Sequence, residues 1–157
     1  MRLTTFSDYT LRVLIYLGVN DAKLATIADI AAAYRISENH LMKVVHFLGQ
    51  RGYVETVRGK GGGMRLARSP VKINVGAVVR ETEENLRLVE CFDAKSSACR
   101  IGPACILRDA LGRALDAFFE SLGRYTLADL LVPKGNLAKA LALPSARRRV
   151  WRISSST

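Results

Sequence analysis

Apolar residues repeat at helical spacing in three segments within the first fifty residues of the chain. The first segment starts near Ser7, the predicted N-cap, and ends near Asn20. The second starts at Thr26, where Asp29 three residues later indicates a capping box with a shortened acid. The third starts at Ser37 and is polar at its exposed N-terminal end. Two short helices joined by a tight turn predict a helix-turn-helix, although an ordinary helical hairpin has the same pattern.

The pattern then changes to one that predicts a β-hairpin. Residues 52–58 have the pattern of a strand, residues 59–63 form a glycine-rich turn, and residues 64–68 form the returning strand. A hairpin directly after a helix-turn-helix is the wing of a winged helix. A Walker phosphate loop is the competing interpretation, and it fails because Lys60 is followed by glycine rather than by Ser or Thr and a helix.

Two further helices are predicted downstream, a short one around residues 74–82 and a long one from about residue 106 to 125. The long helix has more apolar surface than a small winged helix can cover, so we expect a symmetric dimer to form through it. Its apolar stripe comprises Leu107, Leu111, Ala114, Leu115, Phe118 and Leu122. The predicted fold class is mainly α with a small β-hairpin wing: a winged helix-turn-helix plus a long dimerisation helix.

The net charge of +10 on this 157-residue chain is distributed unevenly. Residues 1–80 carry 12 Lys/Arg against 5 Asp/Glu, residues 81–132 carry 6 against 9, and residues 133–157 carry 6 against none. These segments are predicted to be a winged helix-turn-helix DNA-binding domain, a cysteine loop with a dimerisation helix, and a basic tail with few packing signals. A basic N-terminal half favours nucleic acid as a partner, although a solvated basic face has the same charge.

The composition also bears on where the protein works. Hydrophobic residues make up 49% of the chain, which is enough for a core. No apolar run approaches the roughly 18–20 residues of a membrane span, so no membrane partner is expected. The N-terminus lacks the apolar core and cleavage site of a signal peptide, and free thiols without an export signal indicate the cytoplasm.

Polar side chains on the third helix and basic ones on the hairpin are candidates for DNA contact. Donors and acceptors such as those of Asn, Lys and Glu read base edges in the major groove. Positive charge at a hairpin tip suits phosphates or the minor groove, although a mobile basic hairpin without function is the alternative. The predicted DNA-contacting residues are Thr26, Ser37, Glu38, Asn39, His40, Lys43, Arg58, Lys60, Gly61 and Arg65.

All three cysteines, Cys91, Cys99 and Cys105, lie within fifteen residues, in a segment that Gly102 and Pro103 should make irregular. Thiolates on a short irregular loop are ligands for a soft metal or an iron–sulfur cluster. Such sites usually take four ligands, so one position is open to an oxygen ligand, a small molecule or a second chain. A weakly held iron is an asset in a sensor. Three incidental cysteines are the alternative.

Together these features resemble the bacterial iron–sulfur winged-helix regulators. The resemblance rests on the helix-turn-helix, the hairpin motif from Arg58 to Arg68, the three-cysteine loop and the closing segment from Tyr125 to Leu130. It covers about residues 1–132, and within the family the chain is most similar to the nitric-oxide-sensitive repressors. The resemblance implies a homodimeric repressor that binds palindromic double-stranded operators of nitric oxide detoxification genes.

The resemblance also implies a cofactor and its ligands. Each subunit is expected to carry one 4Fe-4S cluster, with a 2Fe-2S or cluster-free form after oxidation. Its ligands are the three cysteines and Asp8 of the partner subunit. Nitric oxide is expected to attack the cluster and break the Asp8 link, so that the recognition helices reorient, with Arg12 in the coupling. The alternative for Asp8 is a first-turn carboxylate that pairs with Arg12 four residues later.

Two other kinds of regulator stay open on sequence grounds. The cysteines could form a zinc site or a thiol redox switch. An iron–sulfur regulator of cluster assembly is a further possibility, but that sister group has a histidine shortly after its third cysteine, whereas Ile106, Leu107 and Arg108 follow Cys105 here. An enzyme is not expected, because the sequence has no nucleotide loop, no Ser/His/Asp set and no second cysteine group.

Overall fold

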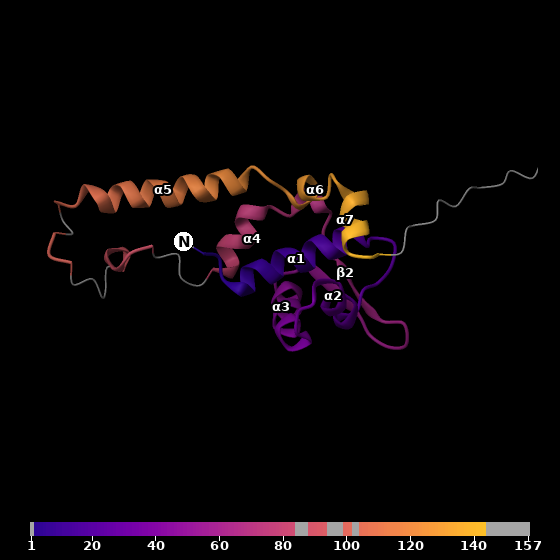
Figure 1. The fold of residues 1–157 in the computed structure, drawn as a ribbon. Coiled ribbons are helices and arrows are strands. Elements are labelled where there is room, and N and C mark those ends of the chain that lie inside the picture. Colours follow the sequence, from indigo (N-terminus) through magenta and orange to yellow (C-terminus); the bar gives the residue numbers. More distant parts are fainter. Residues whose placement is uncertain (1, 84–87, 94–98, 102–103, 144–157) are drawn as a thin grey trace, which may run out of the picture.

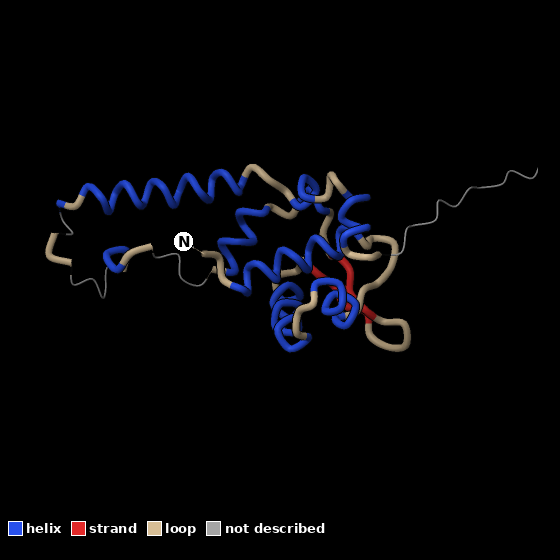
Figure 2. The backbone as a smooth tube through the Cα atoms, viewed as in Figure 1, coloured by secondary structure: helices blue, strands red, loops and turns tan. Residues whose placement is uncertain are grey.

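The computed structural model describes residues 2–83, 88–93, 99–101 and 104–143. Within them the chain is mainly helical, with one antiparallel pair of strands (Figure 1, Figure 2). The predicted fold class is confirmed. The elements in chain order are α1 (Thr5–Val19), α2 (Ile27–Tyr34), α3 (Glu38–Gln50), β1 (Val54–Val57), β2 (Gly63–Leu66), η1 (Pro70–Lys72), α4 (Val75–Thr82), η2 (Glu90–Phe92), α5 (Ile106–Gly123), α6 (Leu127–Leu130) and α7 (Lys134–Ala140).

Helix α1 begins earlier than the sequence pattern predicted. Thr4 has an extended backbone (φ −64°, ψ 154°), and its hydroxyl accepts a hydrogen bond from the backbone N–H of Ser7. Thr4 is therefore the N-cap, and the prediction that Ser7 caps this helix is wrong. Ser7 lies inside the first turn and is fully buried, and its hydroxyl donates a hydrogen bond to that of Thr82 in α4. Both residues are small and hydroxylated, so preference for the cap position alone does not separate them.

Helices α2 and α3 form a helix-turn-helix that packs against α1. The predicted capping box is confirmed, since the hydroxyl of Thr26 accepts from the backbone N–H of Asp29 and the Asp29 carboxylate accepts from that of Thr26. Arg35, with φ of 56°, ends α2 in the left-handed conformation. Ser37 begins α3 as predicted, without a capping hydrogen bond from its side chain. Buried side chains shared by the three helices include Leu14, Leu17, Ile30, Leu41, Val44 and Leu48.

The wing is a short sheet that is fixed at its base. Strands β1 and β2 pair with Thr56 opposite Met64. Met64 also exchanges two backbone hydrogen bonds with Ala25, at 3.0 and 2.7 Å, which attaches the hairpin to the segment before α2. Gly63 fits here because a Cβ at this position would lie 2.8 Å from the carbonyl oxygen of Ala25. These contacts fix the base of the wing to the segment before α2.

Helix α5 is attached to the winged helix through its C-terminal end. Gly76 of α4 approaches Gly123 so closely that a Cβ on Gly76 would lie 2.7 Å from the backbone nitrogen of Gly123. The side-chain amide of Asn74 donates to the Gly123 carbonyl at 2.6 Å. Phe119 is buried beside α4, with the guanidinium of Arg80 4.1 Å from its ring centroid. The N-terminal half of α5 extends beyond α4 (Figure 1).

The segment after α5 returns to the body of the winged helix. Leu127 of α6 is buried in the core, and Leu141, just after α7, is buried as well. Lys134 forms an ion pair with Asp21, which follows α1, at 2.6 Å. Residues 134–143 of the predicted tail thus include helix α7, and Leu141 and Leu143 pack in or against the core. Residues 144–157, with the arginine and serine runs of the tail, lie outside the described residues.

Candidate nucleic-acid interface and cysteine segment

The outward surface of α3 has the character of a base-reading helix. Its inward side is committed to the core through Leu41, Val44 and Leu48. The exposed side chains on the other side are those of Glu38, Asn39, His40, Met42, Lys43 and His46. A helix with one buried stripe and one polar, exposed stripe can enter the major groove without losing its packing.

Met42 is a candidate that sequence reasoning missed. It is an exposed large apolar residue, with 50% of its surface accessible. It lies three residues after Asn39 and four before His46, so helical spacing places all three on one strip. An apolar side chain among polar ones on a reading helix suits the methyl group of thymine. The signal was available, because position 42 falls outside the apolar stripe that packs on the core.

Two of the predicted contact residues already have partners within the protein. The hydroxyl of Thr26 donates to Asp29 at 2.7 Å within the capping box. Hydrogen bonds from the backbone and side chain of Thr26 lower the pKa of the Asp29 carboxyl. The ring of His40 lies 6.2 Å from that of Tyr9, centroid to centroid, at the edge of α3 that faces α1. Both residues are nevertheless exposed, as are Asn39 and Lys43.

The predicted DNA-contacting residues of the wing have two kinds of surroundings, the exposed tip and an ion pair across the sheet. Arg58, Lys60 and Gly61 are exposed at the tip, where Gly61 has φ of 79°, a conformation that L side chains rarely adopt. Arg65, by contrast, lies opposite Glu55 across the sheet and forms an ion pair with it. An ion pair between exposed side chains is weak, so Arg65 can exchange Glu55 for a phosphate.

Asp8 and Arg12 form a two-point ion pair on the exposed side of α1. Arg12 Nε lies 3.1 Å from Asp8 Oδ1, and Arg12 Nη2 lies 2.9 Å from Oδ2. The guanidinium also lies 5.7 Å from the ring centroid of Tyr34 in α2 and 6.0 Å from that of Tyr9. Burial raises the pKa of Tyr34 to about 12. Arg12 therefore joins Asp8 to the helix-turn-helix.

The cysteines lie on the segment between α4 and α5. Cys91 is half-buried in η2, Cys99 is exposed, and Cys105 is half-buried at the residue before α5. None of the three is in a disulfide. Gly102 and Pro103, which were predicted to make the loop irregular, lie outside the described residues. Within the described part of one chain, no three His, Cys, Asp or Glu side chains are arranged as a metal site.

The donor chemistry of this segment fits iron. Thiols outside any disulfide, on a segment with little regular structure among its described residues, are the ligands that iron–sulfur clusters take. Both histidines of the chain lie on α3, among the candidate DNA contacts. Iron–sulfur clusters usually take four protein ligands, so three thiols leave one position for another donor.

Comparison with known proteins identifies the family. Residues 3–133 match the family model Rrf2, described as an iron-dependent transcriptional regulator. The chain belongs to the Rrf2 family. Two relatives of this Rrf2 protein are named HTH-type transcriptional regulator NsrR. The one from Geobacillus kaustophilus is 55% identical over 142 residues, which cover 90% of this chain and 97% of the relative. The one from Bacillus subtilis is 50% identical over 144 residues, covering 91% and 99%.

Solved structures show the same fold. CymR, the global cysteine regulator of B. subtilis, is similar with a TM-score of 0.67 at 29% identity, covering 83% of this chain and 95% of CymR. T. potens IscR is similar with a TM-score of 0.66 at 25% identity, covering 83% and 86%. The resemblance inferred from the sequence motifs is therefore confirmed.

This Rrf2 protein is a helix-turn-helix transcriptional regulator and not an enzyme, as the sequence predicted. Its family is iron-dependent, in agreement with the donor chemistry of the cysteine segment. Across the part of the chain that the structure describes, no helix has the combined length and apolar character needed to cross a membrane.

Proposed function

We propose that this Rrf2 protein is a homodimeric repressor that binds palindromic operator DNA and releases it when nitric oxide reacts with a 4Fe-4S cluster in each subunit. It acts in the cytoplasm on genes for nitric oxide detoxification. One observation carries the proposal: three thiols lie within fifteen residues, directly before α5, in a chain about half-identical to regulators named NsrR. Residues 1–80 bind DNA in this proposal, and residues 81–132 hold the cofactor and the partner subunit.

The DNA surface consists of α3 and the wing. Asn39 and Lys43 lie on the exposed strip of α3 and are suited to base edges, with Met42 beside them suited to a thymine methyl. Arg58 and Lys60 at the wing tip are suited to phosphates or the minor groove. Phosphate contacts fix the position of the protein, whereas base contacts select the sequence.

Dimerisation through α5 is supported by the surface that this helix leaves uncovered. Phe119 is the one buried residue of α5, whereas Ile106 and Leu107 are 80% and 65% exposed. Within the predicted apolar stripe, Leu107 and Ala114 are exposed and the other four residues are half-buried, so the single chain covers the stripe only in part. A symmetric second copy would cover this stripe and would place two recognition helices on one DNA.

Cys91, Cys99 and Cys105 are the proposed cluster ligands of each chain, with Asp8 of the partner subunit as the fourth. A bound cluster would supply iron that reacts with nitric oxide. A carboxylate is a harder donor than a thiolate and a weaker match for such iron, so Asp8 is the weakest ligand in the proposed set. The exposed position of Asp8 on α1 supports this role.

Arg12 connects Asp8 to the helix-turn-helix, so a change in what Asp8 binds can alter the DNA-binding surface. One hydrogen bond and one further ion-pair contact join Arg12 to both carboxylate oxygens of Asp8. An iron bond to either oxygen would compete with the guanidinium for the charge of that carboxylate. Because the same guanidinium lies against Tyr34 and Tyr9, any displacement changes the contact between α1 and the helix-turn-helix.

Iron and acid-labile sulfide analysis of protein purified without oxygen tests the cofactor directly. We expect about four irons and four sulfides per chain. Zinc without sulfide would indicate a structural zinc site, and neither metal after anaerobic reconstitution would indicate a thiol redox switch. Either result would reject the cluster while leaving the winged helix as a DNA reader.

A further inference from the structure

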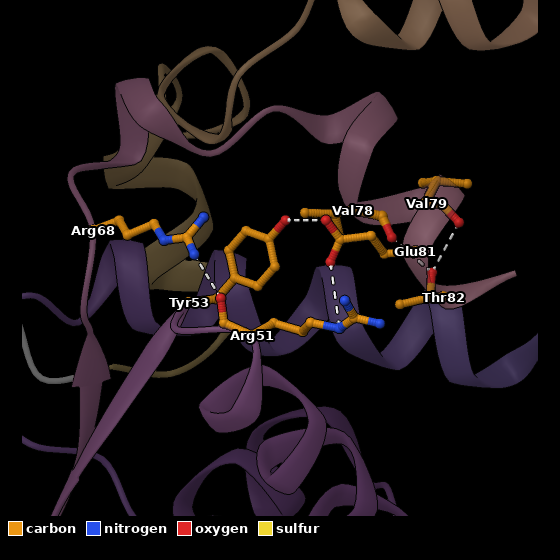
Figure 3. A network of polar contacts seen from close by, with 7 residues as sticks. All are labelled: Arg51, Tyr53, Arg68, Val78, Val79, Glu81 and Thr82. Atoms are coloured by element: carbon orange, nitrogen blue, oxygen red, sulfur yellow. Dashed lines mark hydrogen bonds and ion pairs between the residues drawn. The ribbon is translucent and has the colours of Figure 1, made fainter.

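The last turn of α4 contacts two separate parts of the winged helix. Glu81 accepts a hydrogen bond from the hydroxyl of Tyr53 at 3.2 Å and lies 3.9 Å from the guanidinium of Arg51 (Figure 3). The next two residues, Thr82 and Glu83, contact the start of α1 instead. One helical turn therefore touches both the end of the recognition helix and the first turn of α1.

Tyr53 lies at the junction between α3 and the wing. Its backbone N–H donates to the carbonyl of Leu48 in α3, and its own carbonyl accepts from the N–H of Ala67 after β2, both at 2.9 Å. The residue is 4% exposed, and the guanidinium of Arg68 lies 4.6 Å from its ring centroid (Figure 3). Glu81 in α4 accepts the hydrogen bond of the Tyr53 hydroxyl. A shift of Glu81 would therefore move a buried side chain whose backbone is bonded to both α3 and the wing.

The other side of this turn holds the start of α1 through hydroxyl groups. The fully buried hydroxyl of Ser7 lies 2.8 Å from Thr82 Oγ1 and 2.5 Å from Glu83 Oε1. It has one hydrogen and can donate to only one of the two at a time. Glu83 also accepts from the backbone N–H and the hydroxyl of Thr4, at 2.8 and 3.1 Å. If Glu83 withdraws, the buried Ser7 hydroxyl keeps Thr82 as its acceptor, whereas Thr4, which is exposed, loses its contacts with Glu83.

Both sources of the proposed iron ligands are close to this contact in the sequence. Seven residues separate Glu83 from Cys91 in the sequence. Thr4 lies one turn before Asp8, whose backbone N–H donates to the Thr4 carbonyl at 3.1 Å. Glu83 thus contacts the first turn of α1 and precedes the cysteine segment in the sequence.

We propose that the C-terminal end of α4, from Glu81 to the C-cap Glu83, relays the state of the cysteine segment to the recognition helix and wing, with Glu81 as a positioning residue. This inference rests on the proposed function. Helix α4 is eight residues long, and Val78 and Val79 hold it in the core. In this proposal α4 and its C-cap Glu83 shift together, so a displacement at Glu83 changes the Glu81–Tyr53 hydrogen bond.

The test compares operator affinity before and after nitric oxide treatment, as the ratio of the two Kd values. Tyr53→Phe removes only the hydroxyl, whereas Glu81→Ala removes its acceptor and the charge facing Arg51. We expect each variant to reduce the wild-type ratio roughly fivefold or more, and the double variant to resemble Glu81→Ala alone. Glu81→Gln, which keeps an acceptor for the hydroxyl, should retain most of the ratio. Asp21→Ala is the control, because it removes a different ion pair, with Lys134, beyond the other end of α1.

Iron content, the Tm of each form and the affinity of the cluster-free form are measured in parallel. An unchanged ratio in both Tyr53→Phe and Glu81→Ala would overturn the inference. A ratio that falls only in proportion to lost iron, or that falls equally in Asp21→Ala, would overturn it as well. If the wild-type protein itself shows no difference between the two forms, the proposed function fails first, so the two failures are distinguishable.

Discussion

Arg12 holds both carboxylate oxygens of Asp8, at 2.9 and 3.1 Å, while its guanidinium lies 5.7 Å from the ring centroid of Tyr34 in the helix-turn-helix. An exposed ion pair of this i, i+4 kind contributes only about 0.3–0.5 kcal/mol to the stability of a helix. Its position is more consequential than its strength. The carboxylate proposed to bind iron is the one that is already connected to the DNA-binding unit.

Substitutions at Asp8 and Arg12 separate the ligand from the ion pair. As an ion pair alone, Asp8→Ala and Arg12→Ala remove the same interaction and should each lower the free energy of unfolding by less than about 1 kcal/mol. If Asp8 also binds iron, Asp8→Ala should shorten the lifetime of bound iron in air, whereas Arg12→Ala should not. Visible absorbance against time measures that lifetime. Equal lifetimes in Asp8→Ala and the wild type would remove Asp8 from the ligand set.

Lys60 is exposed at the wing tip, whereas Arg65 is paired with Glu55, so substitutions at Lys60 and Glu55 should change DNA binding in opposite directions. Lys60→Ala should reduce the slope of log Kd against log salt by about one, because one phosphate contact is lost. Glu55→Gln should instead strengthen binding, since Arg65 would be released from its partner across the sheet. Binding isotherms at several salt concentrations measure both slopes. A slope that Lys60→Ala leaves unchanged would mean that the wing tip does not contact DNA.

Met42 should read thymine through its methyl group. Replacing each operator thymine in turn by deoxyuridine removes only that methyl, and one buried methyl contributes about 0.8 kcal/mol, or roughly fourfold in Kd. The wild-type protein should lose this factor at one half-site position, and Met42→Ala should be insensitive there. Equal sensitivity of the two proteins at every thymine would show that Met42 does not contact a thymine methyl.

Thr26→Ala should lower the free energy of unfolding by about 1 kcal/mol, because it breaks the capping box. The lowered pKa of Asp29 sets the pH dependence. The stability that the Asp29 carboxylate contributes is fully present above the ordinary carboxyl pKa near 4 and is lost as the pH falls through the lowered value. The difference in free energy of unfolding between the wild type and Thr26→Ala should therefore shrink in strong acid. Ser37→Ala is the control, since Ser37 makes no capping hydrogen bond and its loss should cost less.

Leu107→Glu on α5 should convert the dimer to a monomer. The leucine is 65% exposed in the single chain, so a charge there costs little unless a second copy covers it. Arg113→Glu is the matched control, because Arg113 is exposed and lies away from the apolar stripe of α5. Sedimentation or light scattering gives the oligomeric state. A dimer that persists in Leu107→Glu would place the interface elsewhere.

The helix-turn-helix and the wing could be predicted because local signals determine them. Apolar spacing, the Thr26–Asp29 capping box and the glycine-rich turn each act over a few residues and agree with one another. The start of α1 was mispredicted because its cap depends on tertiary contact: Glu83 and Thr82 bury Ser7, and no local pattern reports that.

The candidate site was only partly predictable for the same reason. The cysteines stand out by their spacing, and the exposed polar residues of α3 by their helical periodicity. The Glu55–Arg65 pair depends on strand register, and the Tyr53–Glu81 hydrogen bond joins residues 28 positions apart. The packing of residues 134–143 on α1 likewise depends on where α5 and α6 place the chain.

The measurement that tests the sensor most directly is a titration of anaerobic, iron-loaded protein with nitric oxide while absorbance and operator binding are followed in one sample. We expect the visible absorbance to fall and the DNA to be released over the same range of nitric oxide. Operator that stays bound after the absorbance has been lost would contradict the central claim, as would equally tight binding by protein that never held iron.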